Sequence, residues 1–170
     1  LSRFFDIPVE RGPDDLTNLP DYFGLDSQQE LLEENDCMIF SEIVDATLLS
    51  IDQIITRALK YKKDGADVID LGCMPDTKFP HLEDTIMKLK ENGCKVSVDS
   101  ANNEELVRGG KAGADYLLSI SEKNFNILDE VSSIPILIPS SPGDMKSLER
   151  IIMKVKRTNR KFFADPILDP

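Results

Sequence analysis

Lys63-Asp-Gly-Ala-Asp-Val-Ile-Asp-Leu-Gly72 carries the strongest signal of the fold, because nearly the same order of residues returns as Lys111-Ala-Gly-Ala-Asp-Tyr-Leu-Leu-Ser119. Asn92-Gly-Cys-Lys-Val-Ser-Val-Asp99 is a looser copy of the same pattern. Each copy is typical of a helix end, a glycine that suits the left-handed turn after a helix, and a short apolar strand. Repeated units of this kind predict an α/β fold with a parallel sheet.

Six short runs rich in Val, Ile, Leu and Phe are expected as strands. They are continuous rather than alternating, which is typical of strands covered on both faces. The expected strands are Met38–Val44, Asp67–Leu71, Lys95–Val98, Tyr116–Ile120, Ile134–Ile138 and Phe162–Ala164. Helix starts are predicted between them at the capping box Ser50-Ile-Asp-Gln53, at Asn102 and at Asp144.

The chain is expected to consist of a lead-in segment, residues 1–37, and a barrel-like domain, residues 38–170. The lead-in is poorly periodic, with one short helix predicted near Ser27–Glu34. In the second part the strand spacing fits either a (β/α)8 barrel or a doubly wound sheet, although the glycine fingerprint of dinucleotide binding is absent. A complete barrel needs about 250 residues, so a barrel in this chain would be incomplete, with about six strands.

The composition excludes several classes of partner. The 170 residues include 20 Lys and Arg against 31 Asp and Glu, a formal charge of −11, which argues against nucleic acid or an anionic membrane surface as the main partner. No apolar stretch approaches the roughly 20 residues of a membrane helix, and the first residues lack the pattern of a signal peptide. Cys37, Cys73 and Cys94 fit neither a disulfide framework nor a zinc site, so we expect buried thiols in a cytoplasmic protein. His81, the one histidine, is expected on the surface or at a helix start.

Four of the six expected strands deliver a carboxylate at their C-terminal ends. These residues are Glu42, Asp70, Asp99 and Asp165. In both architectures ligands bind at this edge of the sheet. Converging carboxylates suit a divalent cation, or a heterocycle whose adjacent N–H and NH2 donors can be met by one carboxylate.

Four motifs follow one another along the chain: Ala66-Asp-Val-Ile-Asp-Leu-Gly72, Val96-Ser-Val-Asp99-Ser100, Lys111-Ala-Gly-Ala-Asp115 and Phe163-Ala-Asp165-Pro166. Their order and spacing resemble those of dihydropteroate synthase and its pterin-binding relatives. Those relatives include the methyltetrahydrofolate and tetrahydromethanopterin methyltransferases. Glu42-Ile-Val-Asp-Ala46 is most similar to the archaeal dihydropteroate synthase-related proteins. The resemblance covers about residues 38–170, and it implies a (β/α)8 TIM-type barrel with a pterin slot at its C-terminal mouth.

The resemblance also implies residues of the site. In the family, the Asp of strand three and the Asp of the Asp-Pro pair in strand six bind the pterin ring, and Asp99 and Asp165 occupy those places. We expect Ser119, Asp70 and Asn102 to belong to the same slot. If Mg²⁺ accompanies the pterin, Glu42 is the candidate ligand, and no catalytic residue is assigned.

Departures from the family pattern concern the chemistry more than the binding. Ser119 stands where the family usually has Asn, and Glu42–Thr47 replaces its Asn-x-Thr-Pro-Asp-Ser-Phe loop. Ile167-Leu-Asp169 replaces the Gly-x-Gly-Phe that follows Asp-Pro. Two later strands, which carry the family's catalytic Lys and anion-binding Arg, have no counterpart in these 170 residues. Pterin binding is therefore better supported than synthase chemistry.

Several functions stay open at this stage. A synthase would join a pterin pyrophosphate to an aminobenzoate-type amine in folate or methanopterin metabolism, and a corrinoid-linked methyltransferase would pass a methyl group from a pterin to a partner protein's cobalt. A metal-dependent aldolase or lyase would use Glu42, Asp70 and Asp165 as ligands. A non-catalytic binding domain on the same barrel is the remaining alternative. The sequence does not decide between a homodimer and a complex with a corrinoid protein.

Overall fold

The computed structural model describes residues 12, 22–24 and 37–167. The chain divides into two units, Leu1–Cys37 and Met38–Pro170, and the fold described below is that of the second. The short helix predicted near Ser27–Glu34 lies outside the described residues.

All six predicted strands are present in one parallel sheet. Each strand pairs with the next in the chain, so the order is β1-β2-β3-β4-β5-β6. The strands are β1 Phe40–Ile43, β2 Val68–Gly72, β3 Lys95–Asp99, β4 Tyr116–Ile120, β5 Ile134–Leu137 and β6 Phe163–Ala164. A doubly wound sheet reverses its strand order at a switch point, and none occurs here. The sheet is therefore a six-stranded portion of a (β/α)8-type barrel, as one of the two alternatives predicted.

Helices connect the strands, and three of them begin where the sequence predicts. The connecting elements are η2 Ala46–Leu48, α3 Ile51–Lys63, α4 Leu82–Glu91, α5 Asn103–Lys111, η3 Phe125–Asp129 and α6 Met145–Lys156. Ser50 and Gln53 form the predicted capping box of α3, and the side chains of Asn102 and Asp144 cap α5 and α6. His81 occupies the N-cap position of α4, where its Nε2 atom lies 2.8 Å from the carbonyl oxygen of Leu49.

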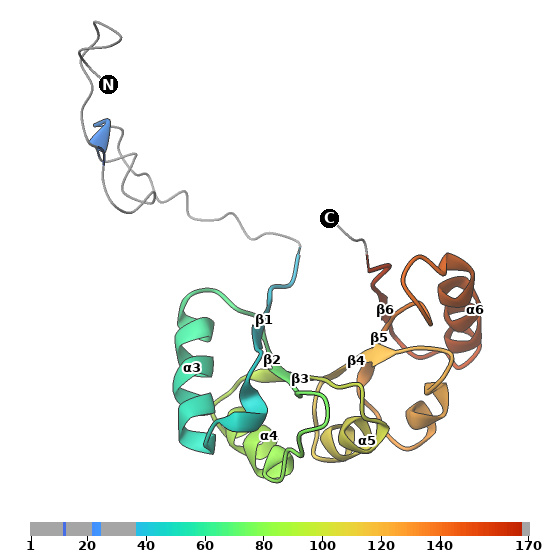
Figure 1. Cartoon of the computed structure of the whole chain (residues 1–170), viewed down its shortest axis with the longest axis horizontal. Coiled ribbons are helices and arrows are strands. Elements are labelled where there is room, and N and C mark those ends of the chain that lie inside the picture. The colour runs from blue at the N-terminus through green and yellow to red at the C-terminus, as the bar shows by residue number, and fades with distance from the viewer. Residues whose placement is uncertain (1–11, 13–21, 25–36, 168–170) are drawn as a thin grey trace, which may run out of the picture. The chain divides into compact units, whose positions relative to one another are not determined.

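The main core lies between the sheet and the helices. Figure 1 shows α3, α4, α5 and α6 following one another along the same side of the row of strands. Leu71, Val98 and Leu117 point to this side and are fully buried with the apolar faces of the helices. Gly109 brings α5 close to β3, because a Cβ at this position would lie 2.9 Å from Cγ2 of Val98. The close contact explains why a glycine is used inside this helix.

The opposite face of the sheet changes character along the strands. Near the strand starts it is aromatic: the ring of Tyr116 lies 5.2 Å from that of Phe40 and 6.1 Å from that of Phe163. Near the strand ends it is acidic, because Glu42 pairs in register with Asp70. Phe163 is 45% exposed, so this face is less covered than the continuous apolar strands predicted.

Among the described helices, none is long and apolar enough to span a membrane. The three cysteines are free thiols, of which Cys94 is buried and Cys73 is half-buried. The expectation of a buried thiol is wrong for Cys37, which is exposed just before the sheet begins.

Candidate functional site

Three carboxylates gather where the first three strands end. Glu42, Asp70 and Asp99 each offer an oxygen, and these oxygens lie within 4.8 Å of one another. The strand register explains the grouping: Glu42 pairs with Asp70, and Asp99 lies two residues beyond Ser97, the partner of Asp70. Since side chains two residues apart share a face of a strand, all three reach the face that the helices do not cover. We call these residues the carboxylate cluster.

Asp70 is the buried member of the cluster. Its side chain is 4% exposed, and its Oδ1 atom accepts a 2.6 Å hydrogen bond from the hydroxyl of Ser97. Burial is the largest cause that raises the pKa of Asp70, the Ser97 hydrogen bond opposes it, and the negative charges of Asp99 and Glu42 add to it; together they bring the pKa to about 6. A carboxyl with this pKa can donate or accept a hydrogen bond close to neutral pH.

Asp99 is held by the next strand. Its Oδ1 atom accepts a 2.5 Å hydrogen bond from the hydroxyl of Ser119 at the end of β4. Ser119 has a left-handed backbone, with φ of +63°, and the pairing of β4 with β5 shifts register at this point. The side-chain amide of Asn124 donates to the carbonyl oxygen of Ser119 at 3.1 Å. A bulge of this kind re-aims a side chain, and here it directs the hydroxyl to the carboxylate.

Gly72, the last residue of β2, makes room for the cluster. A Cβ at this position would lie 2.5 Å from Oε1 of Glu42 and 3.1 Å from Cα of Val44. Only a residue without a side chain lets the Glu42 carboxylate lie against the strand here.

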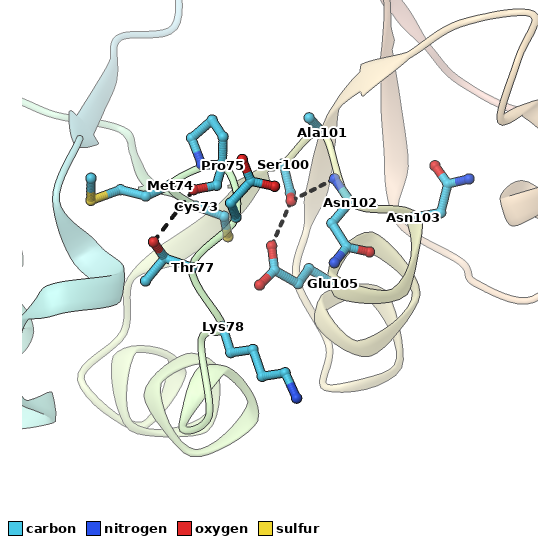
Figure 2. A pocket seen from close by; sticks show the side chains of 11 residues that line it. Cys73, Met74, Pro75, Thr77, Lys78, Ser100, Ala101, Asn102, Asn103 and Glu105 are labelled. Atoms are coloured by element: carbon cyan, nitrogen blue, oxygen red, sulfur yellow. Dashed lines mark hydrogen bonds between the residues drawn. The ribbon is translucent and has the colours of Figure 1, made fainter.

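Beside the cluster lies a cleft of about 630 Å³ between the loop after β2 and the start of α5. Figure 2 shows Cys73 to Lys78 on one side and Ser100 to Asn103 on the other, with Glu105 between them. Glu105 is 4% exposed, and its carboxylate accepts from the Ser100 hydroxyl at 2.6 Å and from the Phe79 N–H at 3.3 Å.

Cys73 lines the cleft, directly after the last residue of β2. Burial and the nearby carboxylate of Glu105 raise the pKa of its thiol to about 12, with a smaller contribution from Asp99. The thiol is therefore protonated at neutral pH, and it is a poor nucleophile.

The structure brings together four of the site residues predicted from the sequence: Glu42, Asp70, Asp99 and Ser119. Asn102 lies at the cleft instead, where its Oδ1 atom caps α5 by accepting from the N–H of Glu104.

Asp165 is exposed just after β6 and is not a member of the cluster. Its Oδ1 atom accepts a 2.8 Å hydrogen bond from the N–H of Ile167, while its own N–H continues the sheet by donating to Leu137. In place of the metal set Glu42, Asp70 and Asp165 considered from the sequence, the structure groups Glu42, Asp70 and Asp99.

Sequence reasoning missed Glu105. The motif Asn102-Asn-Glu-Glu105 resembles an ordinary capping signal, and a carboxylate in the first turn of a helix is usually solvated. The Ser100 hydroxyl, five residues before Glu105, was the available signal, because it supplies the hydrogen bond that a buried carboxylate requires.

Comparison with curated proteins gives an uncharacterized relative and an enzyme. No family model matches the chain. The uncharacterized protein MJ0107 of Methanocaldococcus jannaschii is 30% identical over 149 residues, which cover 78% of this chain and 28% of the relative. Dihydropteroate synthase type-3 of Escherichia coli is 41% identical over 66 residues, 33% of this chain and 25% of that enzyme. The chain thus spans about a quarter of the length of these curated relatives.

Solved structures of dihydropteroate synthases share the fold. The Xanthomonas albilineans enzyme in complex with 7,8-dihydropteroate matches with a TM-score of 0.65 at 14% identity, over 81% of this chain and 63% of that one. The Coxiella burnetii enzyme in complex with pteroic acid matches with a TM-score of 0.63 at 16% identity, over 82% and 64%. The family resemblance predicted from the sequence is confirmed at the level of the fold: the described chain has the α/β architecture of the dihydropteroate synthases, as six strands of their barrel.

Proposed function

We propose that this chain binds a pterin at the C-terminal ends of β2, β3 and β4, and that it is the pterin-binding part of a dihydropteroate synthase-like protein. The observation that supports this most is the Asp99 carboxylate, held by Ser119 at 2.5 Å and lying beside the buried carboxyl of Asp70. The cluster occupies the edge of the sheet at which barrel enzymes bind their ligands.

The chemistry of the cluster suits the ring. A 2-amino-4-oxopteridine presents two adjacent donors, an N–H and an NH2 group, which one ionised carboxylate can accept together. Asp99 can make this paired contact through Oδ2 and the second lone pair of Oδ1, since the hydrogen bond from Ser119 uses one lone pair of Oδ1. Asp70, with its pKa near 6, can accept from a donor or give its proton to a ring acceptor.

Two transferase reactions begin from a pterin in this position. The fold neighbours are named dihydropteroate synthases, and the Xanthomonas albilineans enzyme is among those complexed with 7,8-dihydropteroate. We therefore propose condensation of a pterin pyrophosphate with an aminobenzoate-type amine as the activity of a longer protein that contains this fold. Methyl transfer from a pterin to a corrinoid is the second reaction, and it needs the same ring contacts. Free thiols in the described part of the chain suit a cytoplasmic protein.

Mg²⁺ is the metal that this proposal includes. Glu42, which the proposed ring contacts leave unused, is its candidate ligand, and the surroundings fit a hard cation because carboxylate oxygens of Asp70 and Asp99 lie within 4.8 Å. A bound Mg²⁺ would neutralise charge on a departing pyrophosphate.

Isothermal titration of the chain with a dihydropterin tests the proposal. Asp99→Asn keeps an oxygen that can accept from Ser119 but loses the charge, so we expect affinity to fall by about 10- to 150-fold, the equivalent of roughly 1.5–3 kcal/mol. Asp45→Asn is the matched control, because the Asp45 carboxylate forms an exposed ion pair with Arg57 at 2.6 Å. Equal affinity of Asp99→Asn and the unmodified chain would contradict the proposed slot.

A further inference from the structure

The outer side of α6, the last helix of the row in Figure 1, differs in charge from the rest of the chain. Residues 145–161 hold seven of the chain's 20 Lys and Arg residues against one carboxylate, that of Glu149. The whole chain, in contrast, has a formal charge of −11. A local excess of positive charge in an acidic protein attracts carboxylates to one place on its surface. This side of the molecule is therefore a candidate interaction surface.

A groove of about 440 Å³ lies on this side of the helix. It is lined by Glu149, Arg150, Met153, Lys154 and Arg157, and we call it the α6 groove. Met153 is 56% exposed, and Arg150 and Arg157 lie one turn before it and one turn after it. The side chain of Arg157 has no carboxylate partner in the described part of the chain. The groove thus offers an apolar centre between cations.

Contacts of two lining residues show which way the α6 groove faces. Arg150 forms an ion pair with Glu122, which follows β4, at 2.7 Å, and Nζ of Lys154 lies 3.4 Å from the same carboxylate. Leu148 and Ile151, on the opposite side of the helix, are buried in the core. The groove therefore faces outward and toward the preceding βα unit, and packing of the core does not use it.

The chain itself contains a segment with the complementary pattern. Residues 26–36, which lie outside the described residues, include five carboxylates and no cation. Two adjacent leucines, Leu31 and Leu32, stand at the middle of this segment, with glutamates before and after them. We call it the acidic segment. An apolar centre surrounded by opposite charges is typical of specific protein interfaces, in which the charges also select the partner.

We infer that the α6 groove binds the acidic segment of a second copy of this chain, with Leu31 or Leu32 against Met153 and glutamates beside Arg150 and Arg157. In a two-fold symmetric pair each copy offers one groove and one acidic segment, so one association makes the contact twice. The two contacts together offset an entropic cost of association that arises only once. The inference does not depend on pterin binding, and its failure would leave the proposed function unchanged.

Sedimentation velocity of the full chain over a range of protein concentrations tests the association. The Debye length falls from about 10 Å at 0.1 M salt to about 3 Å at 1 M. We therefore expect a dimer whose dissociation constant rises at least about tenfold between about 0.1 M and about 1 M NaCl. A chain that stays monomeric at the lower salt overturns the inference, and so does a dimer that salt does not weaken.

Exchanging charges between the two surfaces identifies the contact. Arg157→Glu changes the groove, and the double variant Glu33→Lys with Glu34→Lys changes the acidic segment. Each variant alone should raise the dissociation constant of the dimer at least about tenfold. An equal mixture of the two should recover a heterodimer, because one of its contacts carries the exchanged charges and the other is unmodified. Far-UV circular dichroism of Arg157→Glu should match that of the unmodified chain if α6 is retained.

Lys63→Glu is the matched control, since it makes the same change of charge at an exposed position near the end of α3. We expect it to leave the dissociation constant unchanged. If it weakens the dimer as much as Arg157→Glu does, net charge is responsible and the inference is wrong. A mixture of the groove and segment variants that remains monomeric also overturns the inference, because contact between copies is what mixing restores.

Discussion

Replacing Asp70 by Asn should stabilise the fold at high pH and not at low pH. Burial is the main cause that raises the pKa of Asp70 from its ordinary 3.8 to about 6. At a pH between these two values, Asp70 is therefore largely protonated in the folded chain and largely ionised in the unfolded chain. Stability therefore falls as the pH rises from about 4 to about 6, and the full cost is present above that window. A difference of about two pKa units at 1.36 kcal/mol each makes this cost about 3 kcal/mol.

The Asp70→Asn variant avoids that cost because its side chain carries no charge, and the amide oxygen can still accept from Ser97. Urea unfolding at pH 4, 5, 6, 7 and 8 should show a free-energy difference between variant and unmodified chain that grows with pH, from near zero to as much as about 3 kcal/mol. Asp129→Asn, at an exposed position, is the control for general effects of pH and of net charge. A difference that is the same at every pH would refute the assignment of Asp70 as a buried carboxyl with a raised pKa.

Three further changes have expected outcomes. Gly72→Ala should lower the free energy of unfolding by roughly 1–3 kcal/mol in urea titrations, because its Cβ would lie 2.5 Å from Oε1 of Glu42; an unchanged midpoint would show that Glu42 simply moves aside. Glu105→Ala should cost about 1–3 kcal/mol in the same assay and speed hydrogen exchange at the N–H of Phe79, which loses its acceptor; exchange at the unmodified rate would count against the contact. Asp165→Asn keeps an oxygen for the N–H of Ile167, so its thermal midpoint should not change, and a loss of pterin affinity in titrations would assign Asp165 to the ligand.

The sequence predicted the strands well because their signal is local. Each βα unit carries its own helix end, glycine and apolar run, so the copies at Gly65 and Gly113 needed no knowledge of the rest of the chain. Local sequence signals could not decide between a barrel and a doubly wound sheet. It depends on which strands lie side by side, and the structure supplied that through the pairing of each strand with its successor.

The sequence predicted part of the site. Glu42, Asp70 and Asp99 could be placed at one edge because the ends of parallel strands meet there, and the structure groups them. Glu105 was not found, since its burial depends on contacts with Ser100 and Phe79 that form only when two loops meet.

Glu105 and Arg108, one turn apart on α5, hold the same residue of the neighbouring loop. The N–H of Phe79 donates to Glu105, and its carbonyl oxygen accepts from Nη2 of Arg108 at 3.0 Å. Both the N–H and the carbonyl oxygen of Phe79 are therefore hydrogen-bonded to side chains of α5. This explains how the loop after β2 is positioned although it lies outside the regular sheet.

The left-handed backbone of Ser119 limits what can replace it over evolutionary time. At φ of +63° a β-branched or large apolar residue is strongly disfavoured, whereas glycine and short polar residues such as Asn and Asp are tolerated. Drift at this position is thereby confined to small substituents, most of which can hydrogen-bond. A local constraint on chain geometry would keep this corner of the barrel hydrophilic even in lineages where the ligand itself has changed.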